Sequence, residues 1–338
     1  SAASDVYKRQ VLLGPGLNIQ RSPLCGRDFE YFSEDPILAG KMAAAYVRGI
    51  QKKGIAACPK HFAVNSQELR RMASDSVVDE RTLRELYLTG FEIVVKEARP
   101  KTIMTSYNLI NGTYANENAH LLQDILRKDW GFDGAVVTDW GGSNDHALGV
   151  KNGSTLEMPC PGGDSIRELM KAVKDGKVTE ADLDARLDEL LELVLSTHAA
   201  VEKAPRTFDA AAHHALARRA AAESIVLLKN KDGILPLKAG EKLAVIGDFA
   251  QTPRYQGAGS SAVNALQVDA LLDCIKADDS GISFVGYASG FDRQGAADPK
   301  KQEEAVSLAK QADTVLLCLG LDLSLIHISE PTRHAQIS

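Results

Sequence analysis

Residues 135–142 read Ala-Val-Val-Thr-Asp-Trp-Gly-Gly, an apolar strand pattern followed at once by a carboxylate, an indole ring and two glycines. Three further apolar runs lie upstream, at 11–13, 55–58 and 102–105, and polar residues come after them too. Amphipathic helix patterns separate these runs, at 36–53, 80–98 and 121–129. This alternation predicts parallel strands joined by crossover helices. Polar residues just after each strand favour a (β/α) barrel, whose site is built from the loops at the strand C-terminal ends.

The pattern changes after two further helices, expected at 165–174 and 180–196. Residues 200–212 contain Pro205 and many small side chains, as linkers do. Beyond them, strands are expected at 225–228, 243–246, 282–285 and 314–317, with helices at 214–223 and 301–310. The sequence therefore predicts an α/β protein with a partial TIM-like barrel domain over 11–199, a linker over 200–212 and an incomplete α/β sandwich over 213–322.

The two ends of the chain do not continue the patterns beside them. Residues 1–10 and 323–338 resemble translations of sequencing adapters, so both are predicted to be non-native tracts. The alternative is an ordinary frayed terminus. We therefore expect native sequence over about 11–322, with the compartment not readable from the ends and a cytoplasmic location favoured.

Composition excludes several classes of protein. Of the 338 residues 44% are hydrophobic and 25% are charged, which is typical of a folded globular protein and not of a disordered one. A net charge of −6 gives no electrostatic footprint for nucleic acid or an anionic membrane, and no apolar run approaches the ~20 residues of a membrane span. The five cysteines are never spaced as C-x-x-C, so they are expected to be reduced core thiols. The oligomeric state is not readable.

Asp139 is the first candidate for chemistry, because it ends an apolar strand and faces the expected mouth of the barrel. A carboxylate at that place can attack or stabilise an electron-poor carbon, although it could also merely cap a segment that begins at Ser143. The cations Arg27, Lys60 and Arg71, together with His61, also lie just beyond strand ends. They would keep an aspartate ionised and supply donors for a polyhydroxylated neutral substrate.

Other kinds of site fit these residues less well. Lys60 could form a Schiff base, but that chemistry needs a desolvated amine and not a wet polar site. His61 has no second His or Cys at ligand spacing, so no metal site is predicted. The segment from Gly14 to Gly16 does not complete a G-x-G-x-x-G fingerprint, and the glycine-rich run 257–261 has no lysine between a strand and a helix. No cofactor is predicted.

Several long motifs, all in one order, resemble glycoside hydrolase family 3, the β-glucosidase group. In the first part they are 18–36 (NIQRSPLCGRDFEYFSEDP), 60–62 (KHF) with Asn65, Gln67, Glu68 and Arg71, 104–108 (MTSYN) with Asn111-Gly112, and 130–134 (WGFDG) leading to 138–140 (TDW). In the second part they are 224–230 (SIVLLKN), 234–237 (ILPL) and 254–261 (RYQGAGSS).

The resemblance implies a retaining exo-acting β-glycosidase acting on β-glucosides or related oligosaccharides. It implies that Asp139 is the nucleophile of a covalent glycosyl-enzyme intermediate. The positions that match residues holding the glycone are Arg27, Lys60, His61, Arg71 and Tyr107, while Trp140 would flank the aglycone and Ser260 would reach the sugar from the second domain.

The sequence departs from the family pattern in two features. The general acid/base of this subgroup is a glutamate downstream of the strand that ends near Gly320, and no residue of the chain is assigned that role, Glu330 included. The barrel part is also shorter than the ~250 residues of a complete barrel. β-Xylosidase or another pentosidase is the rival within the family, and a non-catalytic sugar-binding module is the rival outside it. β-N-Acetylhexosaminidase is disfavoured because Phe62-Ala63-Val64 replaces the Phe-Pro-Gly typical of that subgroup.

Overall fold

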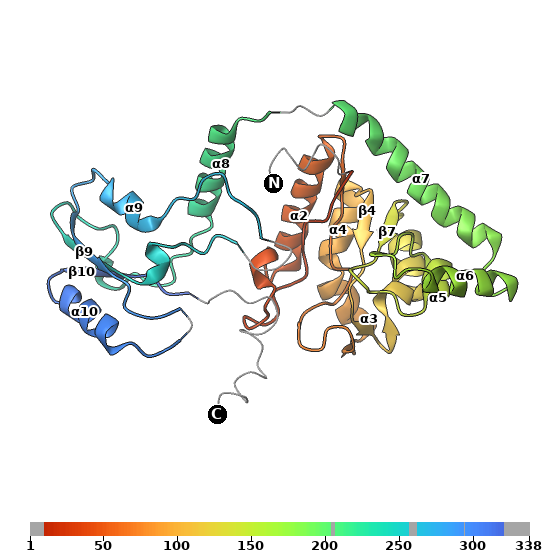
Figure 1. The fold of residues 1–338 in the computed structure, drawn as a ribbon, viewed down its shortest axis with the longest axis horizontal. Coiled ribbons are helices and arrows are strands. Elements are labelled where there is room, and N and C mark those ends of the chain that lie inside the picture. Colours follow the sequence, from red (N-terminus) through yellow and green to blue (C-terminus); the bar gives the residue numbers. More distant parts are fainter. Residues whose placement is uncertain (1–9, 204–206, 257–261, 294, 321–338) are drawn as a thin grey trace. The chain divides into compact units, whose positions relative to one another are not determined.

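The computed structural model describes residues 10–203, 207–256, 262–293 and 295–320, and side chains over the same ranges apart from 201–203. These residues form two compact units, one ending at Thr207 and one beginning at Phe208. Figure 1 shows both units as ribbons coloured along the sequence. The predicted linker at 200–212 overlaps the last turn of one helix and the start of the next, and its residues 204–206 lie outside the description. The predicted domain boundaries stay a prediction.

The first unit alternates strands and helices. Its strands are β1 (Val11–Leu12), β2 (Ala56–Ala57), β3 (Asp75–Ser76), β4 (Thr102–Met104), β5 (Leu109–Ile110), β6 (Thr113–Tyr114) and β7 (Ala135–Val137). Its α-helices are α2 (Pro36–Gln51), α3 (Glu80–Thr82), α4 (Thr89–Ala98), α5 (His146–Asn152), α6 (Asp164–Lys174) and α7 (Glu180–Lys203). Short 3-10 turns η1 (Asp28–Glu30) and η3 (Ala115–Glu117) and π-helical segments η2 (Leu83–Tyr87) and η4 (His120–Asp129) complete it.

Parallel pairing brings the ends of the four predicted strands together. β1 pairs with β2 and β4 pairs with β7, both in parallel. Isolated parallel bridges join Gly16 to Lys60, Phe62 to Thr105 and Val137 to Leu156, so the pairing continues beyond the named strands. The Thr102 hydroxyl donates to the Ala57 carbonyl at 2.9 Å, which links the two strand pairs. The first unit is a partial TIM-like barrel, as the sequence predicts, with the polar segments after each strand at one end of the strands.

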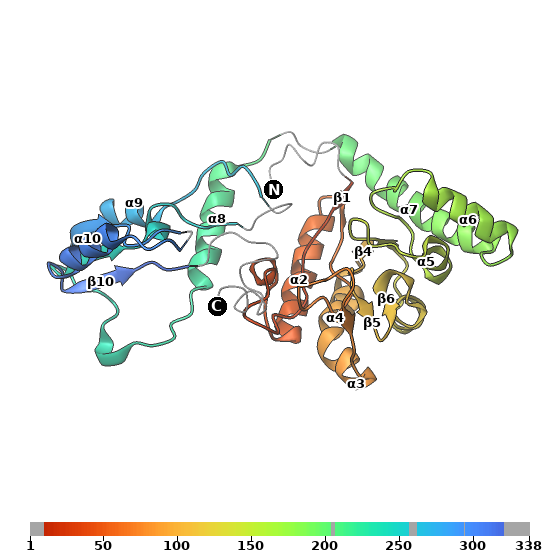
Figure 2. The same ribbon diagram turned by 60° about the horizontal axis from the view of Figure 1, so that its bottom comes forward.

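Helices α2 and α4 lie side by side over the sheet (Figures 1 and 2). Asp35 begins α2, because its side chain accepts from the backbone amide of Ile37 at 2.8 Å and Pro36 fits the first helical position. The two helices approach closely at Gly40, where an added Cβ would lie 3.0 Å from the Gly90 Cα. Small residues at this crossing therefore set how near the helices come to each other.

The core of the first unit lies between these helices and the sheet. The Phe62 ring is fully buried and packs edge-on against two others, with centroids 5.2 Å from Phe91 and 5.8 Å from Trp130. Leu121, Leu122, Ile125 and Leu126 of η4 are buried in the same cluster. Because Phe62 directly follows Lys60 and His61 in the chain, packing of its ring in this aromatic cluster anchors the backbone of the polar segment at 60–61.

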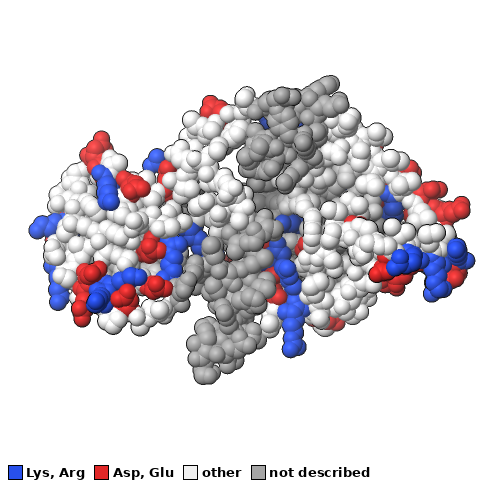
Figure 3. All heavy atoms as spheres, viewed as in Figure 1, with Lys and Arg blue, Asp and Glu red and all other residues white. Residues whose placement is uncertain are grey.

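The second unit has a small parallel sheet in the order β10-β8-β9, with β8 (Lys242–Ile246) between β9 (Ser283–Ala288) and β10 (Thr314–Leu317). Its helices are α8 (Ala210–Glu223), α9 (Leu271–Lys276) and α10 (Pro299–Ala309), with 3-10 turns η5 (Lys231–Gly233) and η6 (Asp248–Ala250). Strand–helix–strand connections of this kind confirm the α/β class. Acidic and basic side chains are interspersed on the face of this unit drawn in Figure 3.

Two expectations differ from the structure. The run Ile225–Leu228 is not a strand, and its four side chains are 61–92% exposed. No described strand pairs with it, so its backbone takes part in no described ladder. The cysteines are all free, as expected, but only Cys25 and Cys58 are buried, and Cys160 is exposed. Cys160 is exposed because it lies in the loop between α5 and α6 and not on an apolar face. No helix among the described residues is long and apolar enough to cross a bilayer.

Candidate active site

Asp139 lies at the C-terminal end of β7, and its side chain is 13% exposed. One oxygen, Oδ1, accepts from the Trp140 backbone amide at 2.7 Å. The other, Oδ2, is 3.5 Å from the His61 Nε2. Asp139 does not cap a helix, because α5 begins at His146 and is capped by Asp145, whose side chain accepts from the Leu148 amide at 2.8 Å. The carboxylate is thus available for contacts with His61 and with a ligand.

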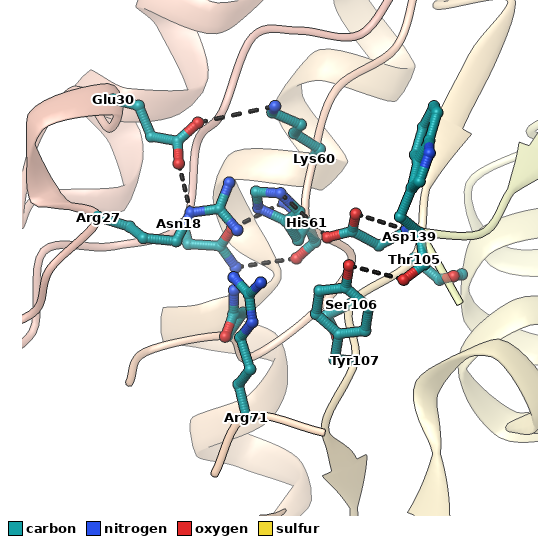
Figure 4. A network of polar contacts seen from close by, with 12 residues as sticks. Asn18, Arg27, Glu30, Lys60, His61, Arg71, Thr105, Ser106, Tyr107 and Asp139 are labelled. Atoms are coloured by element: carbon teal, nitrogen blue, oxygen red, sulfur yellow. Dashed lines mark hydrogen bonds and ion pairs between the residues drawn. The ribbon is translucent and has the colours of Figure 1, made fainter. Parts of the chain in front are cut away.

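His61 lies beside Asp139, and Asn18 holds its backbone (Figure 4). Its backbone amide donates to the Asn18 Oδ1 at 2.7 Å, and the Asn18 Nδ2 donates back to the His61 carbonyl at 2.9 Å. The imidazole is 1% exposed. Burial lowers the pKa of His61 well below its usual range, and the nearby charges of Arg27 and Lys60 lower it further. His61 is therefore neutral, and it offers one N–H donor and one acceptor nitrogen.

Glu30 connects two of the predicted cations. The Arg27 Nε donates to the Glu30 Oε1, and the Lys60 Nζ lies 3.7 Å from the Glu30 Oε2. The Arg27 and Lys60 side chains are 7% and 17% exposed, so both are largely buried. Each has further N–H groups that do not bind Glu30. Because one carboxylate anchors both, a guanidinium and an ammonium are held in fixed positions on the same side of His61.

Arg71 and Tyr107 form the opposite side of the site. The Arg71 Nη1 donates to the buried Glu68 at 2.7 Å, and its guanidinium lies 4.7 Å above the Tyr107 ring centroid. The Tyr107 hydroxyl donates to the Trp140 carbonyl at 2.9 Å, which ties this side to the segment after β7. Burial and the charge of Asp139 raise the pKa of Tyr107 to about 12. Tyr107 is thus a proton donor at neutral pH.

Charge in this cluster is balanced. The cations Arg27, Lys60 and Arg71 face the carboxylates of Glu30, Glu68 and Asp139, while His61 and Tyr107 are neutral. Burial raises the pKa of Glu68, although Arg27 and Arg71 oppose that shift. Among the described residues, no group of three or more His, Cys, Asp or Glu is placed to hold a metal ion. The cluster is suited to a neutral ligand with many hydroxyl groups, which both donors and acceptors can bind.

The structure brings together most of the residues singled out from the sequence. One network of contacts (Figure 4) contains Asp139, Arg27, Lys60, His61, Arg71 and Tyr107. The backbone of Trp140 also contacts Tyr107 and Asp139, and Trp140 is 47% exposed. Ser260 lies outside the described residues. Sequence reasoning missed the roles of Asn18, Glu30, Tyr31 and Glu68 as partners in the network. Their only signal was that they lie in the same motifs as the cations.

Residues 9–193 match the glycosyl hydrolase family 3 N-terminal domain, and residues 225–332 match the glycosyl hydrolase family 3 C-terminal domain. The chain belongs to glycosyl hydrolase family 3. It is 45% identical over 314 residues to the thermostable beta-glucosidase B of Acetivibrio thermocellus, covering 92% of this chain and 41% of that protein. It is 47% identical over 324 residues to an exo-alpha-(1->6)-L-arabinopyranosidase of Bifidobacterium longum, covering 93% and 42%.

Solved structures give the same relationship. The GH3 beta-glucosidase of Bifidobacterium adolescentis superposes with a TM-score of 0.86 at 44% identity, covering 94% of this chain and 47% of that one. Beta-glucosidase 3B of Thermotoga neapolitana, in complex with alpha-D-glucose, superposes with a TM-score of 0.76 at 36% identity, covering 89% and 41%. The chain thus spans less than half the length of these relatives. The likeness supports a TIM-like barrel followed by an α/β sandwich.

The burial of neutral His61 predicts a pH-dependent stability. The unfolded chain protonates this histidine near pH 6.5, whereas the folded chain does not, so unfolding takes up a proton below that pH. The free energy of unfolding should therefore fall as the pH drops below 6.5, by up to about 1.4 kcal/mol per pH unit, until the folded pKa is reached. His61→Gln should lack this part of the slope. Urea titrations followed by tryptophan fluorescence report on the first unit, since both tryptophans lie there.

His120 provides the control. It is about half exposed, and Glu80 and Asp124 raise its pKa although burial opposes them, so its protonation stabilises the folded state and that contribution is lost as the pH rises. His120→Gln should change the slope slightly and in the opposite direction. An identical pH dependence in the wild type and in His61→Gln would contradict a neutral His61.

Proposed function

We propose that the protein is a retaining exo-acting β-glycosidase that removes terminal β-D-glucosyl residues. The observation that carries this proposal is the Asp139 carboxylate, held at the end of β7 inside a cluster of N–H and O–H donors. In the proposed first step, an Asp139 oxygen forms a bond to the anomeric carbon as the bond to the leaving oxygen breaks. The leaving group takes the electron pair, and water later cleaves the glycosyl ester with net retention.

The donors around Asp139 are proposed to hold the glycone. Arg27 and Lys60 would donate to sugar hydroxyls from the Glu30 side, and Arg71 from the Tyr107 side. His61 would act near the anomeric end because it lies against Asp139. Trp140 would flank the aglycone with its half-exposed ring. Ser260 remains a proposed contact from the second domain. The proposal assigns the general acid/base to no residue of this chain.

An exo-α-L-arabinopyranosidase is a second candidate, favoured by the 47% identity to the Bifidobacterium longum enzyme. It falls within the pentosidase alternative. Its glycone shares with a β-glucosyl residue a pyranose ring and an equatorial anomeric bond, and differs at C4 and in lacking the hydroxymethyl group on C5. The same nucleophile could therefore act on either sugar, and the choice depends on contacts to those two positions.

The test uses 2,4-dinitrophenyl glycosides, whose leaving group departs without protonation and so needs no general acid. We expect the chain to release one equivalent of dinitrophenolate from the β-D-glucoside about tenfold faster or more than from the β-D-xyloside or the α-L-arabinopyranoside, the scale of one lost apolar or polar contact. A faster reaction with the arabinopyranoside would instead select the second candidate. Glucose binding without release from any substrate would indicate a sugar-binding module.

A further inference from the structure

Tyr31 makes a contact that the proposed mechanism does not use. Its hydroxyl lies 3.3 Å from the His61 Nδ1, and the two rings meet edge-on with centroids 6.3 Å apart. Tyr31 is 6% exposed. Its hydroxyl is therefore in hydrogen-bonding range of that imidazole nitrogen. Tyr31 thus contacts the Nδ1 of the His61 imidazole, whereas Asp139 lies near the Nε2.

The Tyr31 ring is fixed by its surroundings. Gly16 leaves room for it, since an added Cβ there would lie 3.0 Å from both the Cδ1 and the Cε1 of the tyrosine. The Tyr31 carbonyl accepts from the Gln20 side chain at 3.1 Å, which holds the backbone. Gly16, which is not part of a dinucleotide-binding fingerprint, therefore has a packing role. It lets a tyrosine ring lie against the backbone next to His61.

The direction of the proton between Tyr31 and His61 follows from their protonation states. Burial raises the pKa of Tyr31 well above its usual range, although Arg27 opposes the shift, so the hydroxyl keeps its proton. A neutral imidazole has one protonated nitrogen and one acceptor nitrogen. If the hydroxyl donates to Nδ1, the imidazole proton is on Nε2 and points at the Asp139 Oδ2. The opposite tautomer would place a nitrogen lone pair against the carboxylate, which is unfavourable.

We propose that Tyr31 is a positioning residue that fixes His61 in its Nε2–H tautomer, so that the imidazole donates to Asp139 and holds the carboxylate in its orientation. The Asn18 contacts to the His61 backbone prevent the ring from shifting as a whole, and the Tyr31 hydroxyl adds to Asp139 in setting which nitrogen carries the proton. The two Asp139 oxygens then receive different donors, the Trp140 amide on Oδ1 and the His61 N–H on Oδ2. The assignment of the tautomer rests on geometry, whereas its effect on rate rests on the proposed function.

The test reads the tautomer by ¹⁵N NMR of the histidine-labelled chain at pH 7.5, with the His61 signals identified by their loss in His61→Gln. The wild type should show a protonated Nε2 and an unprotonated Nδ1. Tyr31→Phe should move both resonances toward averaged values as the second tautomer becomes populated. Tyr46→Phe is the matched control, because Tyr46 is 52% exposed on α2, and it should leave the wild-type pattern unchanged.

A protonated Nδ1 in the wild type, or an unchanged tautomer in Tyr31→Phe, would overturn the proposal. The wild-type spectrum decides the point even if the variant does not fold. A second readout is the dinitrophenolate release rate, which should fall about 5- to 10-fold in Tyr31→Phe, the value of one lost hydrogen bond, with the apparent KM unchanged. An unchanged rate beside a changed tautomer would overturn the positioning role. A chain without glycosidase activity would contradict the proposed function while leaving the spectra to decide the tautomer.

Discussion

Asp139→Asn is expected to lower the rate of dinitrophenolate release from the β-D-glucoside by at least about 10⁴-fold, the scale of loss when a covalent catalyst loses its nucleophile. The substitution replaces one oxygen by a nitrogen of similar size, so the Trp140 amide can still donate to the remaining oxygen. The neutral amide is a poor nucleophile, while Glu30 and Glu68 still pair with Arg27, Lys60 and Arg71 in the variant. The folded structure should therefore persist while the chemistry is lost. Stopped-flow absorbance of dinitrophenolate measures the effect.

Asp145→Asn is the matched control for that experiment. Asp145 lies six positions further along the chain and caps α5 through the Leu148 amide, a role that asparagine fills about as well. Both the release rate and the free energy of unfolding should stay close to wild type. If Asp139→Asn retained release within tenfold of wild type, Asp139 would not be the nucleophile.

Phe62→Ala is expected to reduce the free energy of unfolding of the first unit by about 3–5 kcal/mol. The ring is fully buried between Phe91 and Trp130, and removing it leaves a cavity in the cluster that supports the polar segment at 60–61. One part of this loss is the free energy of transferring the ring from water to the core. The other part comes from the cavity, because the neighbours in a close-packed core relax only partly and do not regain their lost contacts. Urea denaturation followed by tryptophan fluorescence measures it.

Phe29→Ala is the control, since that ring is 40% exposed and should cost no more than about 0.5 kcal/mol. Phe62→Leu keeps most of the buried volume and should cost about 1.5 kcal/mol or less. A loss below about 1 kcal/mol for Phe62→Ala would show that the cluster does not support the site segment in the way described.

The local pattern of the chain predicted most of the first unit. The apolar runs at 55–58, 102–105 and 135–138 each contain a strand, because a short β-rich run between helix patterns has few other ways to bury its side chains. The same reasoning failed at 225–228, where the run is as apolar but no described strand pairs with it. A strand depends on a neighbour for its hydrogen bonds, and local sequence does not contain that information.

The site was predictable only in part, for the same physical reason. Position after a strand end indicated Lys60, His61 and Asp139, because strand ends of a barrel converge. The partners of these residues depend on contacts across the fold. Tyr31 reaches His61 over 30 positions, and Glu30 meets Lys60 over a similar span. Residue type alone did not distinguish Glu30 from the other acidic side chains of the chain, so its contact with Lys60 could not be predicted.

The most direct test of the account is to trap the covalent intermediate with 2-deoxy-2-fluoro-β-D-glucopyranosyl fluoride. The fluorine at C2 destabilises the oxocarbenium-like transition state of hydrolysis, while the fluoride at C1 leaves without a general acid, so a glycosyl ester accumulates. Mass spectrometry after proteolysis should find one label per chain, on the peptide that contains Asp139, and none in Asp139→Asn. A label on Glu30 or Glu68, or a label that persists in Asp139→Asn, would contradict the assignment of Asp139 as the nucleophile.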